Sequence, residues 1–364
     1  MERNLIASLL IISWILIACG VSVAGSTVPA IFIFGDSLFD AGNNHYNRNC
    51  TAQADFPPYG SNFFHRPTGR FTNGRTVADF ISEFIGIPLQ KPFMEAHSEI
   101  VNGTQNKYPS NGVNFASAGS GVLQATNNDS GVTPIQVQLQ QFQTMAEQNH
   151  IDADLIKNSM FFIESGSNDI FNFFLPFYTP TLTPDDYVQS MLVQVESFLD
   201  SIYKLGARRF ALFALGPVGC VPARALLPGA PVTKCYGKMN KMVKKFNMGL
   251  EKLVNGIQAK YPGAAGVYGA VYKTVQIFRA NPERYGFTNT TSACCGFGVL
   301  GGEVQCGKEG YTVCKNPKDY LFWDFFHPSE HTYKLISKAL WGGNRSRIRP
   351  FNLKTMANMT TLHH

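Results

Sequence analysis

The sequence lacks several features that would place it in other classes of protein. It contains no C-x-x-C pair, so neither a zinc ribbon nor a thioredoxin-like redox motif is indicated. Its formal net charge of +6 comes without a clustered basic stripe or a recognisable nucleic-acid-binding motif. No internal repeat, low-complexity tract or long linker divides the chain. These absences argue against a nucleic-acid partner and favour one globular domain.

Long apolar runs are also absent, except at the N-terminus. An apolar run from Leu5 to Ile17 follows a charged start and precedes small residues that end at Ser26. This is the layout of a secretory signal peptide, and the run is shorter than the roughly 20 residues that span a bilayer. We therefore expect residues 1–25 to be removed, leaving a single mature domain over residues 26–364. We expect that domain to have no membrane span and to be secreted, to the cell exterior or the vacuole.

Secretion changes how the cysteines are interpreted, because an oxidising compartment favours disulfides. Seven cysteines follow the signal segment, so at least one stays unpaired. The spacing of Cys220 and Cys235 predicts a bridge that closes a short loop. The pairing among four later cysteines stays open; these are Cys294, Cys295, Cys306 and Cys314.

Six Asn-x-Ser/Thr sequons fit the same route, because such sites accept glycans only in the secretory pathway. We expect glycosylation among these positions, which are Asn49, Asn102, Asn128, Asn289, Asn344 and Asn358.

Apolar, β-rich runs alternate with segments of helical periodicity along the mature chain. Alternating strands and helices predict an α/β fold with a parallel sheet covered by helices on both faces. The expected strands are residues 30–34, 112–116, 159–163, 209–215 and 266–271. The expected helices are residues 77–85, 135–148, 187–205, 236–261 and 329–341.

Polar motifs follow three of these strands. They are Gly35-Asp36-Ser37, Ala118-Gly119-Ser120-Gly121 and Gly166-Ser167-Asn168-Asp169. Open parallel sheets bind their ligands outside the carboxyl ends of the strands. The three motifs converge on one edge if their strands are parallel and adjacent.

Ser37 has the position expected of a nucleophile, at the turn after a strand. A serine hydroxyl is a weak nucleophile, so it needs a neighbouring base and an oriented acid. Asp324 and His327 supply both within one turn of chain. A carboxylate three residues before an imidazole can bind Nδ1 and leave Nε2 to accept the serine proton.

The ordered motifs resemble those of plant GDSL esterases and lipases, a branch of the SGNH hydrolase superfamily. The resemblance spans nearly the whole mature chain. It implies a three-layer α/β/α fold with a flavodoxin-like central parallel sheet. The motifs that carry it are residues 34–44, 67–75, 112–121, 166–169, 216–222, 293–296 and 323–328.

The resemblance also implies roles for the candidate residues. Ser37, Asp324 and His327 would be the catalytic residues. The backbone N–H groups of Ser37 and Gly119 and the side-chain amide of Asn168 would form the oxyanion hole, which stabilises the charge of a tetrahedral intermediate. Gly121 remains an alternative to Gly119, and Asn168 could instead be a turn residue that bonds its own backbone.

Other polar residues have simpler interpretations. Asp36 and Asp169 are expected to stabilise turns. His331 lies four residues after His327, but the sequence between them does not follow the H-E-x-x-H order, so no metal site is expected. The aromatic run from Phe171 to Tyr178 could line an acyl pocket, form a lid or belong to the core.

These features predict an enzyme that hydrolyses a small-molecule or lipid ester through a Ser37 acyl-enzyme, with no cofactor. One alternative is an acyltransferase, in which the same acyl-enzyme passes its acyl group to an alcohol. The other is a non-catalytic partner protein that resembles myrosinase-associated proteins. The substrate depends on the shape of the pocket, which the sequence does not give.

Overall fold

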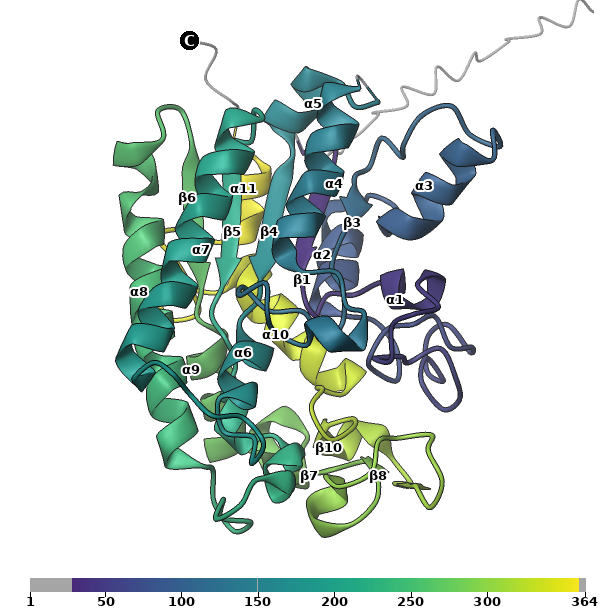
Figure 1. Cartoon of the computed structure of the whole chain (residues 1–364), viewed down its shortest axis with the longest axis vertical. Helices are drawn as coiled ribbons and strands as arrows, with labels where there is room; N and C mark the ends of the chain where they lie inside the picture. The colour runs from purple at the N-terminus through teal and green to yellow at the C-terminus, as the bar shows by residue number, and fades with distance from the viewer. Residues whose placement is uncertain (1–27, 149, 360–364) are drawn as a thin grey trace, which may run out of the picture.

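The computed structural model of the chain describes residues 28–148 and 150–359 (Figure 1). The segment 1–25 predicted to be a signal peptide lies outside these residues. A seven-stranded sheet runs through the centre in the order β11-β6-β5-β4-β1-β3-β2. Its strands are β1 (Ile31–Gly35), β2 (Lys91–Pro92), β3 (Val113–Asn114), β4 (Met160–Glu164), β5 (Arg209–Phe213), β6 (Ala265–Gly269) and β11 (Ile348–Arg349).

All neighbouring strands of this sheet are parallel except the edge strand β11, which is antiparallel to β6. The inner order β3-β1-β4-β5-β6 is the order of flavodoxin-like sheets, whose direction of winding switches beside the first strand. The predicted fold class, an α/β fold with a flavodoxin-like parallel sheet, is therefore confirmed.

Helices cover both faces of the sheet, which makes three layers. In Figure 1, α4, α7 and α8 lie in front of the sheet, whereas α2, α10 and α11 lie behind it. The helices are α1 (Asn43–Tyr46), α2 (Val77–Ile85), α3 (Phe93–Val101), α4 (Ile135–Glu147), α5 (Ala153–Asn158), α6 (Ser167–Asn172), α7 (Pro184–Lys204), α8 (Gly237–Lys260), α9 (Val271–Ala280), α10 (Glu330–Gly342) and α11 (Leu353–Ala357).

The core is rich in phenylalanine on both sides of the sheet. On the front face Phe34 stacks on Phe115, with ring centroids 4.9 Å apart. On the back face Phe213 meets Phe39 and Phe162 at 5.4 and 5.2 Å. Burial on both faces explains why these strands are continuous apolar runs in the sequence.

Capping residues set the starts of two predicted helices. The Thr183 side chain accepts a hydrogen bond from the Asp186 N–H, and Pro184 occupies the first turn, so α7 begins three residues before the predicted Tyr187. Likewise, the Ser329 side chain caps α10 by accepting from the Thr332 N–H.

The predicted strand over residues 266–271 extends too far at its C-terminal end. The chain leaves the sheet at Gly269, and Val271 begins α9, a helix that the apolar pattern did not indicate. The run at residues 112–116 contributes only the two paired residues of β3. An apolar run alone does not tell where strand pairing stops.

Two small two-stranded sheets form in a part of the chain that we call the disulfide segment, residues 289–322. They pair β7 (Asn289–Ala293) with β10 (Tyr320–Phe322), and β8 (Cys295–Gly296) with β9 (Thr312–Val313). The predicted Cys220–Cys235 disulfide is confirmed. The pairs left open from the sequence are Cys294–Cys314 and Cys295–Cys306, while Cys50 is a buried free thiol.

Within residues 28–148 and 150–359, no helix combines the length and the apolar character needed to cross a bilayer.

Candidate active site

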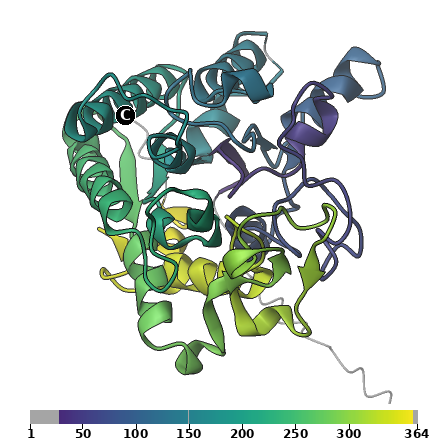
Figure 2. The same cartoon turned by 60° about the horizontal axis from the view of Figure 1, so that its bottom comes forward.

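The candidate residues meet at the carboxyl edge of the central sheet. Strand β1 lies between β3 and β4, so the three polar motifs converge there as predicted. Ser37 follows β1, Gly119 lies in the loop after β3, and Asn168 begins α6 after β4. Asp324 and His327 come from the loop between β10 and α10. Figure 2 brings this edge forward and shows the disulfide segment beside the loops that follow β1.

Ser37, His327 and Asp324 form a continuous chain of hydrogen bonds. The Ser37 Oγ lies 2.7 Å from Nε2 of His327, and Nδ1 of His327 lies 2.7 Å from Oδ1 and 2.9 Å from Oδ2 of Asp324. Asp324 is fully buried, and Ser37 and His327 are 9% and 5% exposed. This geometry fixes the imidazole with Nε2 directed at the serine hydroxyl.

Asp324 is held by more groups than the imidazole. Its Oδ1 accepts the backbone N–H groups of Phe326 and His327, and its Oδ2 accepts the Tyr59 hydroxyl at 2.6 Å. A buried carboxylate needs such donors to offset its lost hydration. Burial and the charge of Asp324 raise the pKa of Tyr59 well above its usual value, so Tyr59 keeps its proton.

The turn after β1 leaves the Ser37 N–H outside its own hydrogen bonds. The Asp36 carbonyl accepts hydrogen bonds from the backbone N–H groups of Phe39 and Asp40. In a trans peptide the N–H points opposite to the carbonyl, so the Ser37 N–H points away from this turn. Among the described residues it meets no acceptor.

The backbone N–H of Gly119 is oriented in a similar way. The Ala118 carbonyl accepts the side-chain amide of Asn44 at 2.9 Å, which directs the Gly119 N–H to the opposite side. That N–H has no acceptor within the part of the chain that the structure describes. Gly119 has a φ of 83°, and a Cβ there would lie 2.9 Å from Val132, so the position favours glycine.

The structure distinguishes Gly119 from its alternative, Gly121. Gly119 lines the cavity beside Ser37, whereas Gly121 packs against the Asp169 carboxylate, where a Cβ would lie 2.3 Å from Oδ2. Asp169 accepts the backbone N–H groups of Val122 and Leu123, which is the turn-stabilising role expected from the sequence.

Asn168 is half-buried and lines the same cavity. Its Nδ2 donates one hydrogen bond, 2.8 Å long, to the Ser120 carbonyl. An amide nitrogen carries two protons, so this bond orients the group and leaves a second proton available. The turn interpretation, in which Asn168 bonds its own backbone, does not match this contact.

A polar network that was not predicted from the sequence holds these loops together. Asp40 accepts the N–H groups of Gly42 and Asn43 and, at 2.9 Å, that of Ala118. It therefore ties the loop after Ser37 to the loop that carries Gly119. Burial raises the pKa of Asp40 to about 6. The run Asp40-Ala-Gly-Asn-Asn44 was the sequence signal of this network, although its role depends on contacts between distant loops.

His331 does not join His327. Its Nε2 donates to the Tyr285 carbonyl at 2.8 Å, which accounts for that nitrogen without a metal. In residues 28–148 and 150–359, no group of three or more His, Cys, Asp or Glu side chains has an arrangement that could hold a metal ion.

The predicted glycosylation sites differ in accessibility. Asn289 is half-buried in β7, and its side chain accepts the N–H groups of Thr291 and Ser292. The other five sequon asparagines are exposed: Asn49, Asn102, Asn128, Asn344 and Asn358.

A cavity of about 400 Å³ opens beside Ser37, and its size lies in the range of small-molecule sites. Polar groups lie near the serine, and the wall is otherwise mostly apolar. Side chains of the α9–α10 region extend it behind the sheet. The apolar residues of this wall include Leu38, Phe71, Phe171, Phe213, Val271, Val275, Phe326, Ile336 and Leu340.

The residues of the aromatic run from Phe171 to Tyr178 do not all have the same role, so more than one of the alternatives left open from the sequence applies. Phe171 and Leu175 line the cavity. Phe173 packs on Tyr187 at 5.0 Å, which is a packing role, and Phe177 is 81% exposed.

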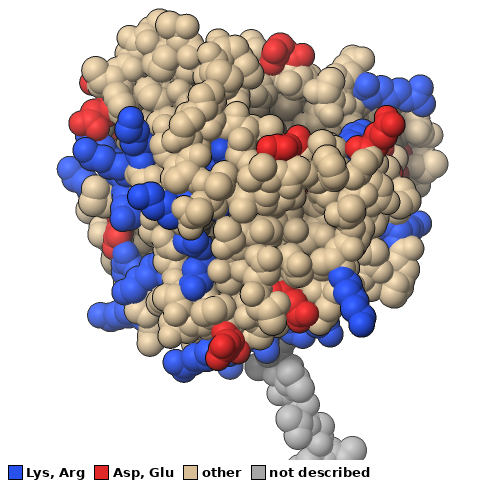
Figure 3. All heavy atoms as spheres, turned by 90° about the horizontal axis from the view of Figure 1, so that it is seen from below, with Lys and Arg blue, Asp and Glu red and all other residues tan. Residues whose placement is uncertain are grey.

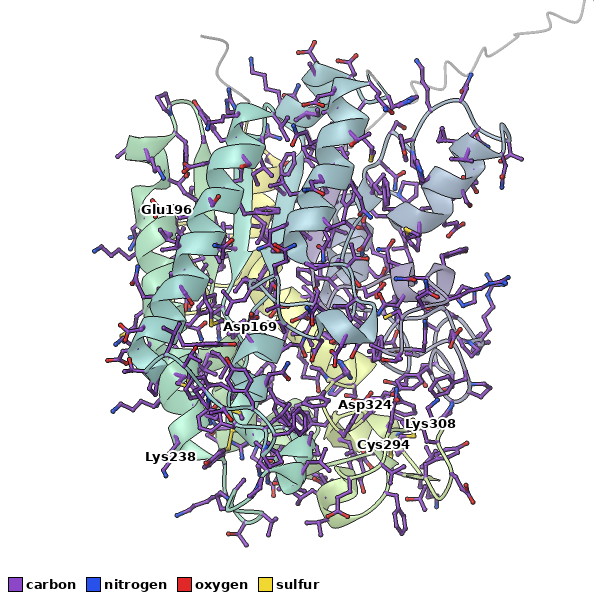
Figure 4. All side chains as sticks on the ribbon, viewed as in Figure 1. Asp169, Glu196, Lys238, Cys294, Lys308 and Asp324 are labelled. Atoms are coloured by element: carbon purple, nitrogen blue, oxygen red, sulfur yellow. A yellow bond between two sulfur atoms is a disulfide. The ribbon has the colours of Figure 1, made fainter. Side chains whose placement is uncertain are left out.

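The molecule presents a largely uncharged surface on the side of the site, with Lys and Arg side chains gathered along one border (Figure 3). Figure 4 places Asp324 beside Cys294 in the lower part of the molecule, and Asp169 higher up, next to the sheet. Asp324 therefore adjoins the disulfide segment.

Comparison with known proteins assigns the chain to a family. The defining pattern of the GDSL-like Lipase/Acylhydrolase family matches residues 31–340. The chain belongs to this family, as the sequence motifs predicted. A hydrolase function of the esterase and lipase type, with small-molecule esters as substrates, follows from this membership.

Several relatives from Arabidopsis thaliana match over most of their length. The chain is 65% identical to "GDSL esterase/lipase 6" over 353 residues, which cover 97% of this chain and 96% of that protein. It is 33% identical to "GDSL esterase/lipase 5" over 347 residues, covering 91% and 88%. It is 34% identical to "GDSL esterase/lipase 7" over 345 residues, covering 91% and 92%.

Proposed function

We propose that the protein is a secreted serine esterase that hydrolyses carboxylic esters through a Ser37 acyl-enzyme. The observation that carries this proposal is the 2.7 Å contact between the Ser37 Oγ and Nε2 of His327, with Asp324 bound to the opposite nitrogen. A serine activated in this way attacks an ester carbonyl, because the imidazole removes its proton as the new bond forms.

The reaction has two steps. In the first, Oγ of Ser37 adds to the carbonyl carbon, its proton moves to Nε2 of His327, and the imidazolium then protonates the leaving alcohol. In the second, water loses a proton to the same nitrogen and attacks the acyl-enzyme, which releases the carboxylic acid and restores Ser37. Asp324 fixes the ring and stabilises the imidazolium in both steps.

The oxyanion of each tetrahedral intermediate would be bound by the Ser37 and Gly119 N–H groups and by the Asn168 amide. All three residues line the cavity, and both N–H groups have no other acceptor among the described residues. Donors fixed before the reaction stabilise developing charge without reorganisation, which makes them the largest single contribution in many acyl transfers.

The mostly apolar cavity suits the acyl part of the substrate. Its wall offers contacts to an aliphatic or aromatic acyl group, whereas the polar groups lie beside Ser37. We therefore expect esters with an extended apolar acyl group to be better substrates than acetate esters.

Labelling with a fluorophosphonate probe tests the proposal. The wild-type protein should react at Ser37, Ser37→Ala should abolish labelling and ester cleavage, and His327→Ala should slow both strongly. Ser201→Ala, which changes a serine on the exposed side of α7, is the matched control and should label normally. Folded wild-type protein that takes up no probe and cleaves no ester would favour a non-catalytic partner protein.

Product analysis separates hydrolysis from acyl transfer. In water alone a hydrolase releases the free acid at the rate at which ester disappears. If release of acid is slow and added alcohol captures most of the acyl group as a new ester, the protein is an acyltransferase.

Secretion is tested on the mature protein made in plant cells. Its N-terminus should begin near Gly25 or Ser26, and glycosidase treatment should reduce its mass. Mature protein that retains Met1 contradicts the proposed signal peptide.

A further inference from the structure

The motif at residues 67–75 lies outside the hydrogen-bonded chain of Ser37, His327 and Asp324. It is a loop that leads into α2. Four consecutive residues of this loop, Arg70 to Asn73, are buried, with exposures of 6% or less. Polar groups in a buried loop need partners, so the contacts of the loop indicate what it does.

The loop is fixed to the start of α2. The Arg70 guanidinium donates two hydrogen bonds, each 2.8 Å long, to the Asp79 carboxylate, and both side chains are buried. Asp79 also accepts the backbone N–H of Thr76, the residue that caps α2. Because a bidentate pair of this kind has a defined geometry, the loop is held in one position relative to α2.

The same loop contacts the chain at His327 and directly after it. The Thr72 hydroxyl donates to the Pro328 carbonyl at 3.1 Å, across a separation of 256 residues. Oδ1 of Asn73 accepts the backbone N–H of Glu330 at 2.8 Å. The Phe71 ring packs against the His327 imidazole, with ring centroids 4.9 Å apart. Three consecutive residues of the loop therefore touch the imidazole or the backbone that follows it.

The Glu330 side chain adds a second set of contacts between α10 and this part of the chain. Its Oε1 accepts Nε of Arg75 at 2.8 Å, and its Oε2 accepts Nδ2 of Asn62 at 3.1 Å. A Cβ at Gly74 would lie 2.5 Å from the carboxyl carbon of Glu330, so the glycine leaves room for this carboxylate. The start of α10 is thus bound to the loop through both its backbone and a side chain.

These contacts restrain a part of His327 that Asp324 does not. Asp324 binds one edge of the imidazole, but the position of the ring also depends on the backbone from which it projects. The Trp323 N–H donates to the His327 carbonyl at 2.8 Å, and Thr72 and Asn73 hold the chain on the other side of that carbonyl. A displacement of about 1 Å in a catalytic group can lower a rate roughly 100-fold.

We propose that the loop at residues 70–75 positions His327, with Thr72 and Asn73 as positioning residues that hold the backbone on its C-terminal side. Neither residue exchanges a proton in the reaction. They act by keeping Nε2 of His327 at a fixed distance from the Ser37 hydroxyl. The inference rests on the proposed function, in which this nitrogen accepts and returns a proton in both steps.

A matched pair of variants at Thr72 tests the proposal. Thr72→Val removes the hydroxyl at nearly constant volume, so it should lower kcat roughly three- to tenfold with little change in KM. Thr72→Ser keeps the hydroxyl and should stay within about twofold of the wild-type kcat. Thr274→Val is the control, because it removes an equally buried hydroxyl that donates to the Ala270 carbonyl within α9, and it should keep kcat.

Urea unfolding of the same variants separates positioning from stability. If Thr72→Val unfolds more easily but keeps the wild-type kcat, the loop has a structural role only and the proposal is wrong. The proposal is also wrong if Thr72→Ser loses as much kcat as Thr72→Val. Arg75→Gln is a second variant, because it changes a partly exposed member of the same network and leaves the buried residues in place. It should lower kcat in the same direction.

Hydrogen exchange measured by mass spectrometry needs no turnover. In Thr72→Val and Arg75→Gln the backbone N–H groups of residues 325–331 should exchange several-fold faster than in the wild type, whereas those of β4 should not change. If the wild type cleaves no ester but exchange changes in this way, the proposed function fails and the restraint of the His327 backbone stands. Unchanged exchange over residues 325–331 in both variants would overturn the inference.

Discussion

The Tyr59 hydroxyl donates a 2.6 Å hydrogen bond to Oδ2 of Asp324, across a separation of 265 residues in the sequence. Gln305, which precedes Cys306, in turn donates to the Tyr59 oxygen at 3.3 Å and to the Gln53 carbonyl at 2.8 Å. The loop after β1, the disulfide segment and the acid of the site are therefore joined in one network.

Removing the Tyr59 hydroxyl should leave the Asp324 carboxylate less firmly oriented. Tyr59→Phe should lower kcat roughly three- to tenfold, because one of the donors to a buried carboxylate is lost, and should reduce the free energy of unfolding by about 1 to 3 kcal/mol. Steady-state kinetics and urea unfolding measure the two effects. Tyr203→Phe, which removes a hydroxyl bound to the Pro262 carbonyl far from the site, is the control. Unchanged kcat in Tyr59→Phe would limit Tyr59 to a structural role.

Asn168→Ala should lower kcat by roughly 10² to 10³ with little change in KM, as expected when an oxyanion donor is lost. The nearby Asn172 is a suitable comparison, because it also lines the cavity but its amide donates to the Asn127 side chain. Asn172→Ala should have a much smaller effect on kcat. If the two variants lose activity equally, the Asn168 amide supports the loop as well and does not bind the oxyanion.

Substrate chain length should be limited by the inner end of the cavity. Each methylene that enters it should raise kcat/KM roughly fourfold, which corresponds to about 0.8 kcal/mol, until the cavity is full. Leu340→Phe narrows this end and should reduce cleavage of long-chain p-nitrophenyl esters while sparing the acetate ester. Val193→Phe, at a half-exposed site on α7, is the control. A chain-length profile that Leu340→Phe leaves unchanged would place the acyl group elsewhere.

Stability should fall as the pH rises from about 4 to about 6. Burial raises the pKa of Asp36 from 3.8 to about 6, so the folded state binds more protons than the unfolded state in this window. The stabilisation is complete below pH 3.8 and is lost above pH 6. The free energy of unfolding of Asp36→Asn, relative to that of the wild type, should therefore rise by roughly 1 to 3 kcal/mol as the pH increases from 4 to 7. Denaturant unfolding measures this difference. The exposed variant Asp185→Asn should show no such gain, and a gain of the same size there would refute the assignment to Asp36.

The sequence predicted the parallel sheet and the meeting of three strand ends because both depend on local patterns. Buried strands are apolar runs, and the polar motifs directly follow them. Ser37 and His327 could also be paired from the sequence, because acyl transfer requires a base near the nucleophile.

The features that could not be predicted from the sequence depend on contacts between segments that are far apart in the chain. Nothing near Tyr59 in the sequence indicates that it reaches Asp324. Thr72 lies in a loop, and its contact with the Pro328 carbonyl joins residues that are 256 positions apart. The strands of the disulfide segment are short, and the longest of them, β7, is polar, so periodicity could not reveal them.

The two disulfides of the disulfide segment lie beside the loop that carries Asp324. Backbone N–H groups of Cys294 and Cys295 donate to the Phe322 and Trp323 carbonyls, directly before Asp324. Bridges of this kind stabilise by about 2 to 4 kcal/mol each. The loop that carries the acid and the base is thus held by bonds that form only under oxidising conditions, while Ser37 is held by the sheet. Reduction of these bridges should therefore loosen the loop that carries Asp324 and His327 more than the turn that carries Ser37.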